Sequence, residues 1–314
     1  MKNNNPKGIL YILVGMAIFS IQDALIKFVY EDTALYELYF GRTLTAIILL
    51  TSYLIFTNQK IILKTHYPFL TVFRVLCFFF GFSFFYVSLT FMSLAMANAL
   101  FFSSPFFVSI LAMLFLKEKI GIRRWSAIFV GFCGVFIVLN PDFNKFKITD
   151  LAPVACALCY SGSMIILKIT NDRDNVYTQL IHLYIGALII SIIFFILTAD
   201  GKFNTFSDPS MQFIFREWFT NPQKAWPIIV ALGFGGSISF LLVFNAYSLA
   251  SPSLISLFEY SLIIYSIIIG YLIFGETPNI RILSGALLII SAGVYIYLRE
   301  KIKNQLIVTE NPIR

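Results

Sequence analysis

The sequence predicts an all-α membrane protein with ten transmembrane helices, arranged as two inverted repeats of five helices each. Its composition is the first of three supporting observations: 59% of the 314 residues are hydrophobic and only 12% are charged, whereas about 25% are charged in soluble domains. The other two are the number of long apolar runs and an echo between the two halves. With a mean hydropathy of +0.83, this much apolar surface requires a bilayer as its solvent.

Ten apolar runs have a length suited to crossing about 30 Å of hydrocarbon. The first lacks a signal-peptide cleavage site, so we expect it to remain as a helix. The predicted spans are residues 8–28, 35–56, 68–90, 94–116, 125–139, 151–169, 176–197, 226–248, 252–274 and 280–298.

Lys and Arg residues in the connections predict the orientation. The connections on the side of the N-terminus hold 14 of them, and the opposite connections hold six, namely Lys145, Lys147, Lys202, Arg216, Lys224 and Arg281. Because cytoplasmic loops are enriched in cations, we expect both termini in the cytoplasm, as an even number of spans requires. The predicted location is a bacterial inner membrane.

Short, similar sequence segments occur in both halves of the chain. Ser93 opens the fourth span within Ser-Leu-Ala, and Ser248 is expected to open the ninth within the same tripeptide, while Lys27 and Lys168 end the first and sixth spans. Five spans is an odd number, so the second copy enters the membrane from the opposite side. We predict one five-helix repeat in residues 1–141, a second in residues 148–300, and a cytoplasmic tail in residues 301–314.

Composition argues against several functions. The net charge of +7 reflects cations at span ends and does not predict nucleic-acid binding. Cys156 and Cys159 form a C-x-x-C inside an apolar helix, where thiols behave as small hydrophobes, and the two histidines, His66 and His182, are far apart in sequence. We therefore expect no catalytic residues, no metal, no cofactor and no enzymatic activity.

The order and spacing of two stretches resemble the drug/metabolite transporter superfamily, specifically its ten-span EamA-type members. The stretches are residues 74–141 and residues 256–298, the second carrying Gly275-Glu276 followed by Gly285 and Gly293. The resemblance implies a secondary transporter that works by alternating access. Within the superfamily, the first half is most similar to bacterial uptake carriers for S-adenosylmethionine and riboflavin.

Charged residues inside spans are costly and need a reason. Asp23, preceded by Gln22, lies in the first span, with Lys27 four residues later; either the two charges neutralise each other, or Asp23 belongs to a substrate or proton pathway. Arg42 is interpreted mainly as reaching towards the headgroups. For Arg74, that interpretation and an internal pair have equal weight.

Glu259 lies deep in the ninth span, where several members of the resembling family carry Arg. This exchange favours a cationic or zwitterionic solute; the alternative is a structural pair with Arg74 or Arg42. The resemblance also implies that several spans with uncharged polar residues line the central cavity. These residues are further candidates for substrate binding. The predicted substrate-binding residues are Gln22, Asp23, Arg74, Asn98, Tyr160, Asn245, Glu259 and Tyr260.

The predicted function is movement of a small polar metabolite across the inner membrane, with S-adenosylmethionine or a similar cationic or zwitterionic solute favoured. An exporter of amino acids or other metabolites, or a riboflavin-type vitamin importer, stays open as the alternative. Proton coupling through Asp23 or Glu259 and facilitated exchange are equally allowed. The expected partners are the small-molecule substrate and the lipid bilayer, with a homodimer also allowed.

Overall fold

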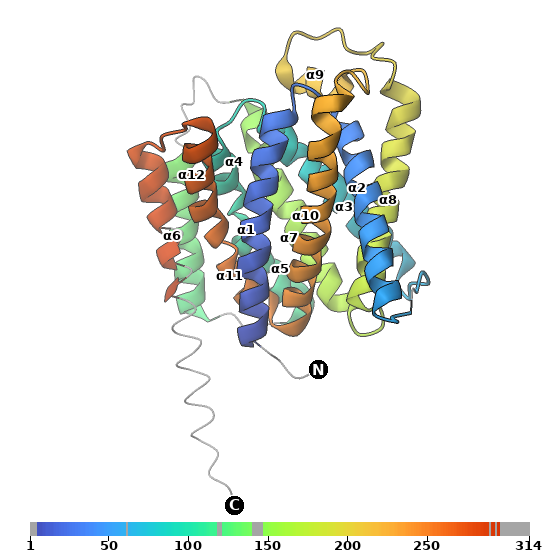
Figure 1. The fold of residues 1–314 in the computed structure, drawn as a ribbon. Coiled ribbons are helices and arrows are strands. Elements are labelled where there is room, and N and C mark those ends of the chain that lie inside the picture. Colours follow the sequence, from blue (N-terminus) through green and yellow to red (C-terminus); the bar gives the residue numbers. More distant parts are fainter. Residues whose placement is uncertain are drawn as a thin grey trace, which may run out of the picture.

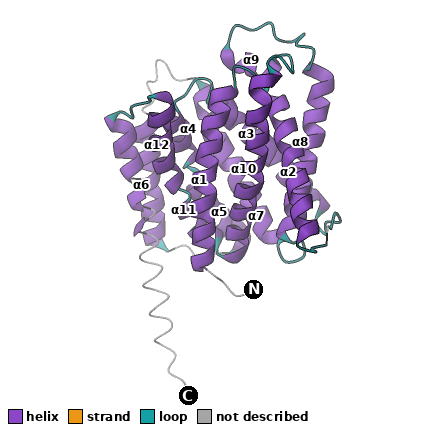
Figure 2. Cartoon of the chain, in the orientation of Figure 1, coloured by secondary structure: helices purple, strands orange, loops and turns teal. Residues whose placement is uncertain are grey.

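The computed structural model describes residues 5–60, 62–117, 121–139, 147–288, 290–292 and 294–295. Helices are the only regular secondary structure in these ranges (Figures 1 and 2). A short 3-10 turn at Ile148–Leu151 precedes α7, and residues 280–288 are helical after α12. The labelled helices are α1 (Asn5–Val29), α2 (Leu35–Phe56), α3 (Pro68–Ser88), α4 (Leu94–Phe101), α5 (Ser104–Leu116), α6 (Ile122–Leu139), α7 (Ala152–Thr170), α8 (Val176–Thr198), α9 (Pro209–Phe215), α10 (Pro222–Leu249), α11 (Pro252–Phe258) and α12 (Ser261–Phe274).

The predicted spans coincide with these helices. Within the described residues, eight segments are long and apolar enough to cross a membrane, counting α4 with α5 and α11 with α12 as one segment each. The fifth and tenth predicted spans contain the shorter apolar helices Trp125–Gly134 and Ile280–Ala292. The ten-helix prediction is therefore confirmed, while the predicted tail 301–314 lies outside the described residues. The short α9 belongs to the long connection between α8 and α10, at the opposite end of the bundle from the start of α1 (Figure 1).

The inverted repeat is visible in the packing. α1 packs along α10, and α7 packs along α3. Because α1 corresponds to α7 and α3 to α10, these are two equivalent contacts between the halves. The predicted correspondence of Ser248 with Ser93 is wrong, because Ser248 and Leu249 are the last residues of α10 and do not open the ninth span. Ser251, which directly precedes α11, is the counterpart of Ser93 before α4.

Lys27 and Lys168 confirm this correspondence. The Lys27 Nζ donates to the carbonyl of Met92, 2.8 Å away, and the Lys168 Nζ donates to the carbonyl of Ala250 at 3.0 Å. Each carbonyl lies two residues before its short helix, α4 or α11. One lysine from the first helix of each half thus stabilises the connection that leads into that half's interrupted span.

Glycines set the spacing of the central helices. A Cβ added to Gly233 on α10 would lie 2.4 Å from the Cβ of Thr45 and 2.7 Å from the carbonyl oxygen of Arg42 on α2. The backbones of α2 and α10 therefore approach too closely for any side chain at this position.

We predict that Gly233→Ala lowers the melting temperature in detergent, because overpacking costs about 1–3 kcal/mol. Gly162→Ala is the matched control, since nothing lies within 4 Å of a Cβ placed there and alanine is the better helix former. An unchanged melting temperature in Gly233→Ala would contradict the close packing of α2 on α10.

Candidate functional site

Two membrane spans are interrupted near their centres. The fourth predicted span breaks at Phe102–Ser103, between α4 and α5, and the ninth breaks at Glu259–Tyr260, between α11 and α12. Non-helical backbone at membrane depth is tolerated only where protein or a cavity surrounds it. In transporters built from inverted repeats, such breaks are typical of the substrate site.

A cavity lies beside these breaks. Its polar groups come from Asp23 on α1 and Asn98 on α4, while most of the other lining residues, among them Tyr160 on α7, are aromatic. The remaining lining residues are Met16, Phe19, Phe82, Phe85, Phe101 and Leu262. The cavity therefore combines one carboxylate, one amide and aromatic walls.

A second, larger cavity shares Phe82 with the first. It adds a cation, Arg42, and the three tyrosines Tyr39, Tyr86 and Tyr184. Its other lining residues are Thr43, Ala46, Val75, Phe78, Phe79, Leu183, Ala187, Gly236 and Phe240. The two neighbouring cavities, which have Phe82 in common, together hold a carboxylate and a guanidinium.

Asp23 on α1 is held by Asn98 on α4, a helix of the same repeat. Its Oδ2 accepts from the amide of Asn98 at 3.3 Å, and that amide also donates to the carbonyl of Leu94. The side chain is only 6% exposed and interacts electrostatically with Arg42. The structural alternative in which Asp23 pairs with Lys27 is wrong, because Lys27 forms its ion pair with Glu276 at 2.6 Å.

Arg42 lies in the interior and does not reach the headgroups, contrary to its sequence interpretation. It donates to the hydroxyl of Tyr86 and, at 2.9 Å, to Oε1 of Gln22, whose amide donates to Ser239. Its guanidinium also lies 5.5 Å from the ring centre of Phe240. The predicted site residue Gln22 therefore positions Arg42 and does not line either cavity.

Glu259 lies behind the wall of the smaller cavity. Its Oε1 accepts from the hydroxyls of Tyr160 at 2.5 Å and Tyr247 at 2.7 Å, and the residue is fully buried. The alternative in which Glu259 forms a structural pair with Arg74 or Arg42 is wrong. Arg74 donates to the side-chain and backbone oxygens of Gln179, at 2.5 and 2.7 Å.

Three predicted residues lie away from both cavities. Arg74 is occupied by Gln179, Asn245 donates to the carbonyl of Leu241 in its own helix, and the ring of Tyr260 packs 5.6 Å from that of Phe102. Sequence reasoning missed the tyrosines around Arg42. Tyr39 lies one turn before Arg42 on α2, which is a local signal for that tyrosine, whereas Tyr86 and Tyr184 come from other helices.

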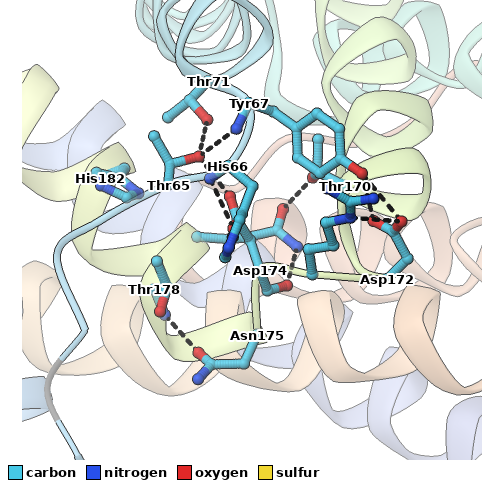
Figure 3. A network of polar contacts seen from close by, with 12 residues as sticks. Thr65, His66, Tyr67, Thr71, Thr170, Asp172, Asp174, Asn175, Thr178 and His182 are labelled. Carbon is cyan, nitrogen blue, oxygen red and sulfur yellow. Dashed lines mark hydrogen bonds and ion pairs between the residues drawn. The ribbon is translucent and has the colours of Figure 1, made fainter.

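Contacts between the halves close the end of the bundle where α1 begins. Thr65 and His66 of the α2–α3 connection bind Asp174 of the α7–α8 connection (Figure 3). The backbone and Nδ1 nitrogens of His66 lie 3.1 and 2.9 Å from Oδ1 of Asp174. We name Thr65, His66 and Asp174 the Asp174 cluster.

An equivalent set closes the opposite end. Glu37, at the start of α2, accepts from the backbone nitrogen of Phe219 at 3.2 Å and from Nε1 of Trp226 at 3.0 Å. Nearby, Lys224 forms an ion pair with Asp32 at 2.5 Å. We name Glu37, Phe219 and Trp226 the Glu37 cluster. The halves are therefore tied together by side-chain contacts at both ends of the bundle.

The Asp174 cluster affects the titration of its carboxylate. Burial disfavours the charged form of Asp174, but hydrogen bonds from Thr65 and from the side chain and backbone of His66 outweigh it and lower its pKa below the ordinary 3.8. The charged carboxylate is thus favoured by the folded protein.

Comparison with known proteins gives a family match over both halves. The model of the EamA-like transporter family matches residues 6–140 and residues 147–298. A solved crystal structure superimposes with a TM-score of 0.71 at 14% identity, covering 94% of this chain and 98% of the other, a similarity of fold alone.

Several curated relatives are similar along the sequence. The S-adenosylmethionine uptake transporter of Rickettsia felis is 28% identical over 295 residues, which cover 94% of this chain and 93% of the relative. The riboflavin transporter of Vibrio cholerae is 26% identical over 63% of this chain and 60% of the relative. The pseudopaline exporter of Pseudomonas aeruginosa is 22% identical over 91% of this chain and 94% of the relative.

We predict that Asp174→Asn lowers the melting temperature at neutral pH, and that Asp172→Asn, at an exposed neighbouring carboxylate, changes it little. A lowered pKa contributes stability above the ordinary value of 3.8, and the contribution is lost as pH falls through the lower folded value. Melting curves from pH 7 to pH 3 should therefore show wild type and Asp174→Asn converging in acid. A constant difference at all pH values would argue against this electrostatic origin.

Proposed function

The chain belongs to the EamA-like transporter family, and from that premise we propose that it imports a cationic or zwitterionic metabolite with an aromatic ring, such as S-adenosylmethionine, by alternating access. One observation carries the proposal. Asp23 and Asn98 face an aromatic-walled cavity beside the two interrupted spans. A carboxylate there attracts a cation, and aromatic faces bind both rings and cationic centres.

The charges of the two cavities favour a zwitterion over a simple cation. Asp23 suits an ammonium or sulfonium group, while Arg42 in the neighbouring cavity suits a carboxylate. We assign Asp23, Asn98 and Tyr160 to direct substrate contact, and Gln22 to holding Arg42. Arg74, Asn245 and Tyr260 line neither cavity in this conformation.

Alternating access follows from the two closed ends. Opening the Asp174 cluster while the Glu37 cluster stays closed connects the cavities to one side of the membrane, and the reverse connects them to the other. Because the clusters occupy corresponding places in the two repeats, one rocking motion of the halves exchanges them. The conformation described here, closed at both ends, supports an occluded intermediate.

A riboflavin-type importer is the second candidate. The lining of the larger cavity is aromatic and aliphatic apart from Arg42, Thr43 and the tyrosine hydroxyls, which suits a neutral fused ring. The Vibrio cholerae relative is named a riboflavin transporter. Export also remains open, because the fold does not fix the direction and one relative is named an exporter. A homodimer stays a prediction.

The uptake prediction uses proteoliposomes and radiolabelled S-adenosylmethionine. Wild type should show saturable uptake, and Asp23→Asn should raise KM about 10–100-fold, because a charge-assisted contact contributes about 1.5–3 kcal/mol. The exposed Asp172→Asn is the matched control. Transport of riboflavin without S-adenosylmethionine would replace the first candidate with the second, and uptake unchanged by Asp23→Asn would remove Asp23 from the site.

We also place both termini in the cytoplasm, since the connections on the side of the N-terminus carry the excess of Lys and Arg. Green fluorescent protein fused to the C-terminus should therefore fluoresce in a bacterial host, whereas alkaline phosphatase at the same point should be inactive. Fusions within the α8–α10 connection should give the opposite pattern. Active phosphatase at the C-terminus would reverse the orientation.

A further inference from the structure

Glu259 is a buried carboxylate that the proposed solute site does not use. It ends α11 at the break before α12, and its exposed fraction is 0%. Oε1 accepts from Tyr160 and Tyr247, but Oε2 has no hydrogen-bond partner among the described groups. The hydroxyl of Ser104 on α5 is close enough to interact with this carboxylate, but neither that hydroxyl nor Oε2 has a hydrogen bond of normal geometry.

The groups that face this carboxylate supply no positive charge. α7 contributes Tyr160, α10 contributes Tyr247, α5 contributes Ser104, and Tyr260 follows in the chain. On α1, the acidic Asp23 is held by Asn98.

The cations of the interior are engaged elsewhere. Arg42 binds Gln22, and Arg74 binds Gln179. Lys168, the cation further along α7, donates to the backbone carbonyls of Tyr247, Ser248 and Ala250. Across the described residues, no Lys, Arg or His forms an ion pair with Glu259.

Protonation of Glu259 removes the cost of burying its charge without a cation nearby. A buried carboxylate without a cation is strongly disfavoured when charged, and protonation at Oε2 gives that atom a hydrogen to donate while Ser104 Oγ can accept one. Two tyrosine hydroxyls on Oε1 still stabilise the anion when the proton leaves. The site is therefore built to hold a carboxylate in either protonation state.

The carboxylate belongs to one half only. Counted from the serines that precede α4 and α11, Glu259 corresponds to Phe101, whose ring lines the smaller cavity. The corresponding break in the first half forms without any acidic residue. The break in the second half therefore does not require Glu259 for its backbone geometry, and the carboxylate needs another reason to be there.

We propose that Glu259 is the proton-binding site of a solute–proton symporter, an inference that rests on the proposed function. Tyr160 separates it from Asp23, because its ring lines the cavity while its hydroxyl binds Glu259. Solute and proton can thus be bound together; a shared carboxylate would make them compete and favour antiport. Oε2 takes a proton from water on the outer side, and after the halves rock the O–H bond breaks and the proton passes to cytoplasmic water.

The test uses proteoliposomes loaded with a pH-sensitive dye, with the voltage clamped and S-adenosylmethionine as the probe, or riboflavin if wild type carries only that. Wild-type uptake should acidify the lumen. An inward gradient of one pH unit should accumulate solute about tenfold for each proton carried, since one pH unit is a factor of ten. Glu259→Gln should lose accumulation and acidification but keep solute counterflow at equal pH, and Glu259→Asp should recover part of the coupling.

The outcomes separate the two proposals. Gradient-driven accumulation by Glu259→Gln at the wild-type level overturns the symport site. If that variant does not reconstitute as folded protein, wild type and Glu259→Asp decide: wild-type uptake without acidification overturns the site, whereas acidification that Glu259→Asp keeps with reduced coupling supports it. Wild type that moves neither solute defeats the proposed function and, with it, this inference.

Discussion

The pairing of backbone groups in hydrocarbon is the constraint on which the rest of this structure depends. Lipid offers no partner for a free N–H or C=O, so every segment that meets lipid is helical. The two interruptions, at Phe102–Ser103 and Glu259–Tyr260, are tolerated because other helices bury them. The smaller cavity lies beside these breaks, whereas the larger one lies between the continuous helices α2, α3, α8 and α10.

Buried charges follow the same logic and link distant helices. Arg42 joins α2 to α1 and α3 through Gln22 and Tyr86, and Lys27 joins α1 to the connection before α4. A charge left unpaired in the bilayer centre would be costly, so each one fixes the position of its partner. These contacts hold the bundle together and also set the polarity of the cavities.

Symmetry and asymmetry have different roles. The lysines before the interrupted spans and the clusters at the two ends repeat in both halves, which gives the protein two equivalent ways to open. Asp23 and Glu259 each occur in one half only, at places where the other half carries an apolar residue or an aromatic ring. The symmetric elements thus support movement, and the asymmetric ones support recognition and coupling.

The sequence by itself determined the number of helices, the inversion and the presence of charges inside spans. These follow from run length, from an odd number of spans in each half and from composition, all of which are local or additive properties. Only the tertiary structure decided the partners: Lys27 binds Glu276, and Glu259 binds Tyr160 and Tyr247. It also corrected the register of the repeat from Ser248 to Ser251. Partners far apart in sequence are chosen by how helices pack and rotate, and no local pattern encodes that choice.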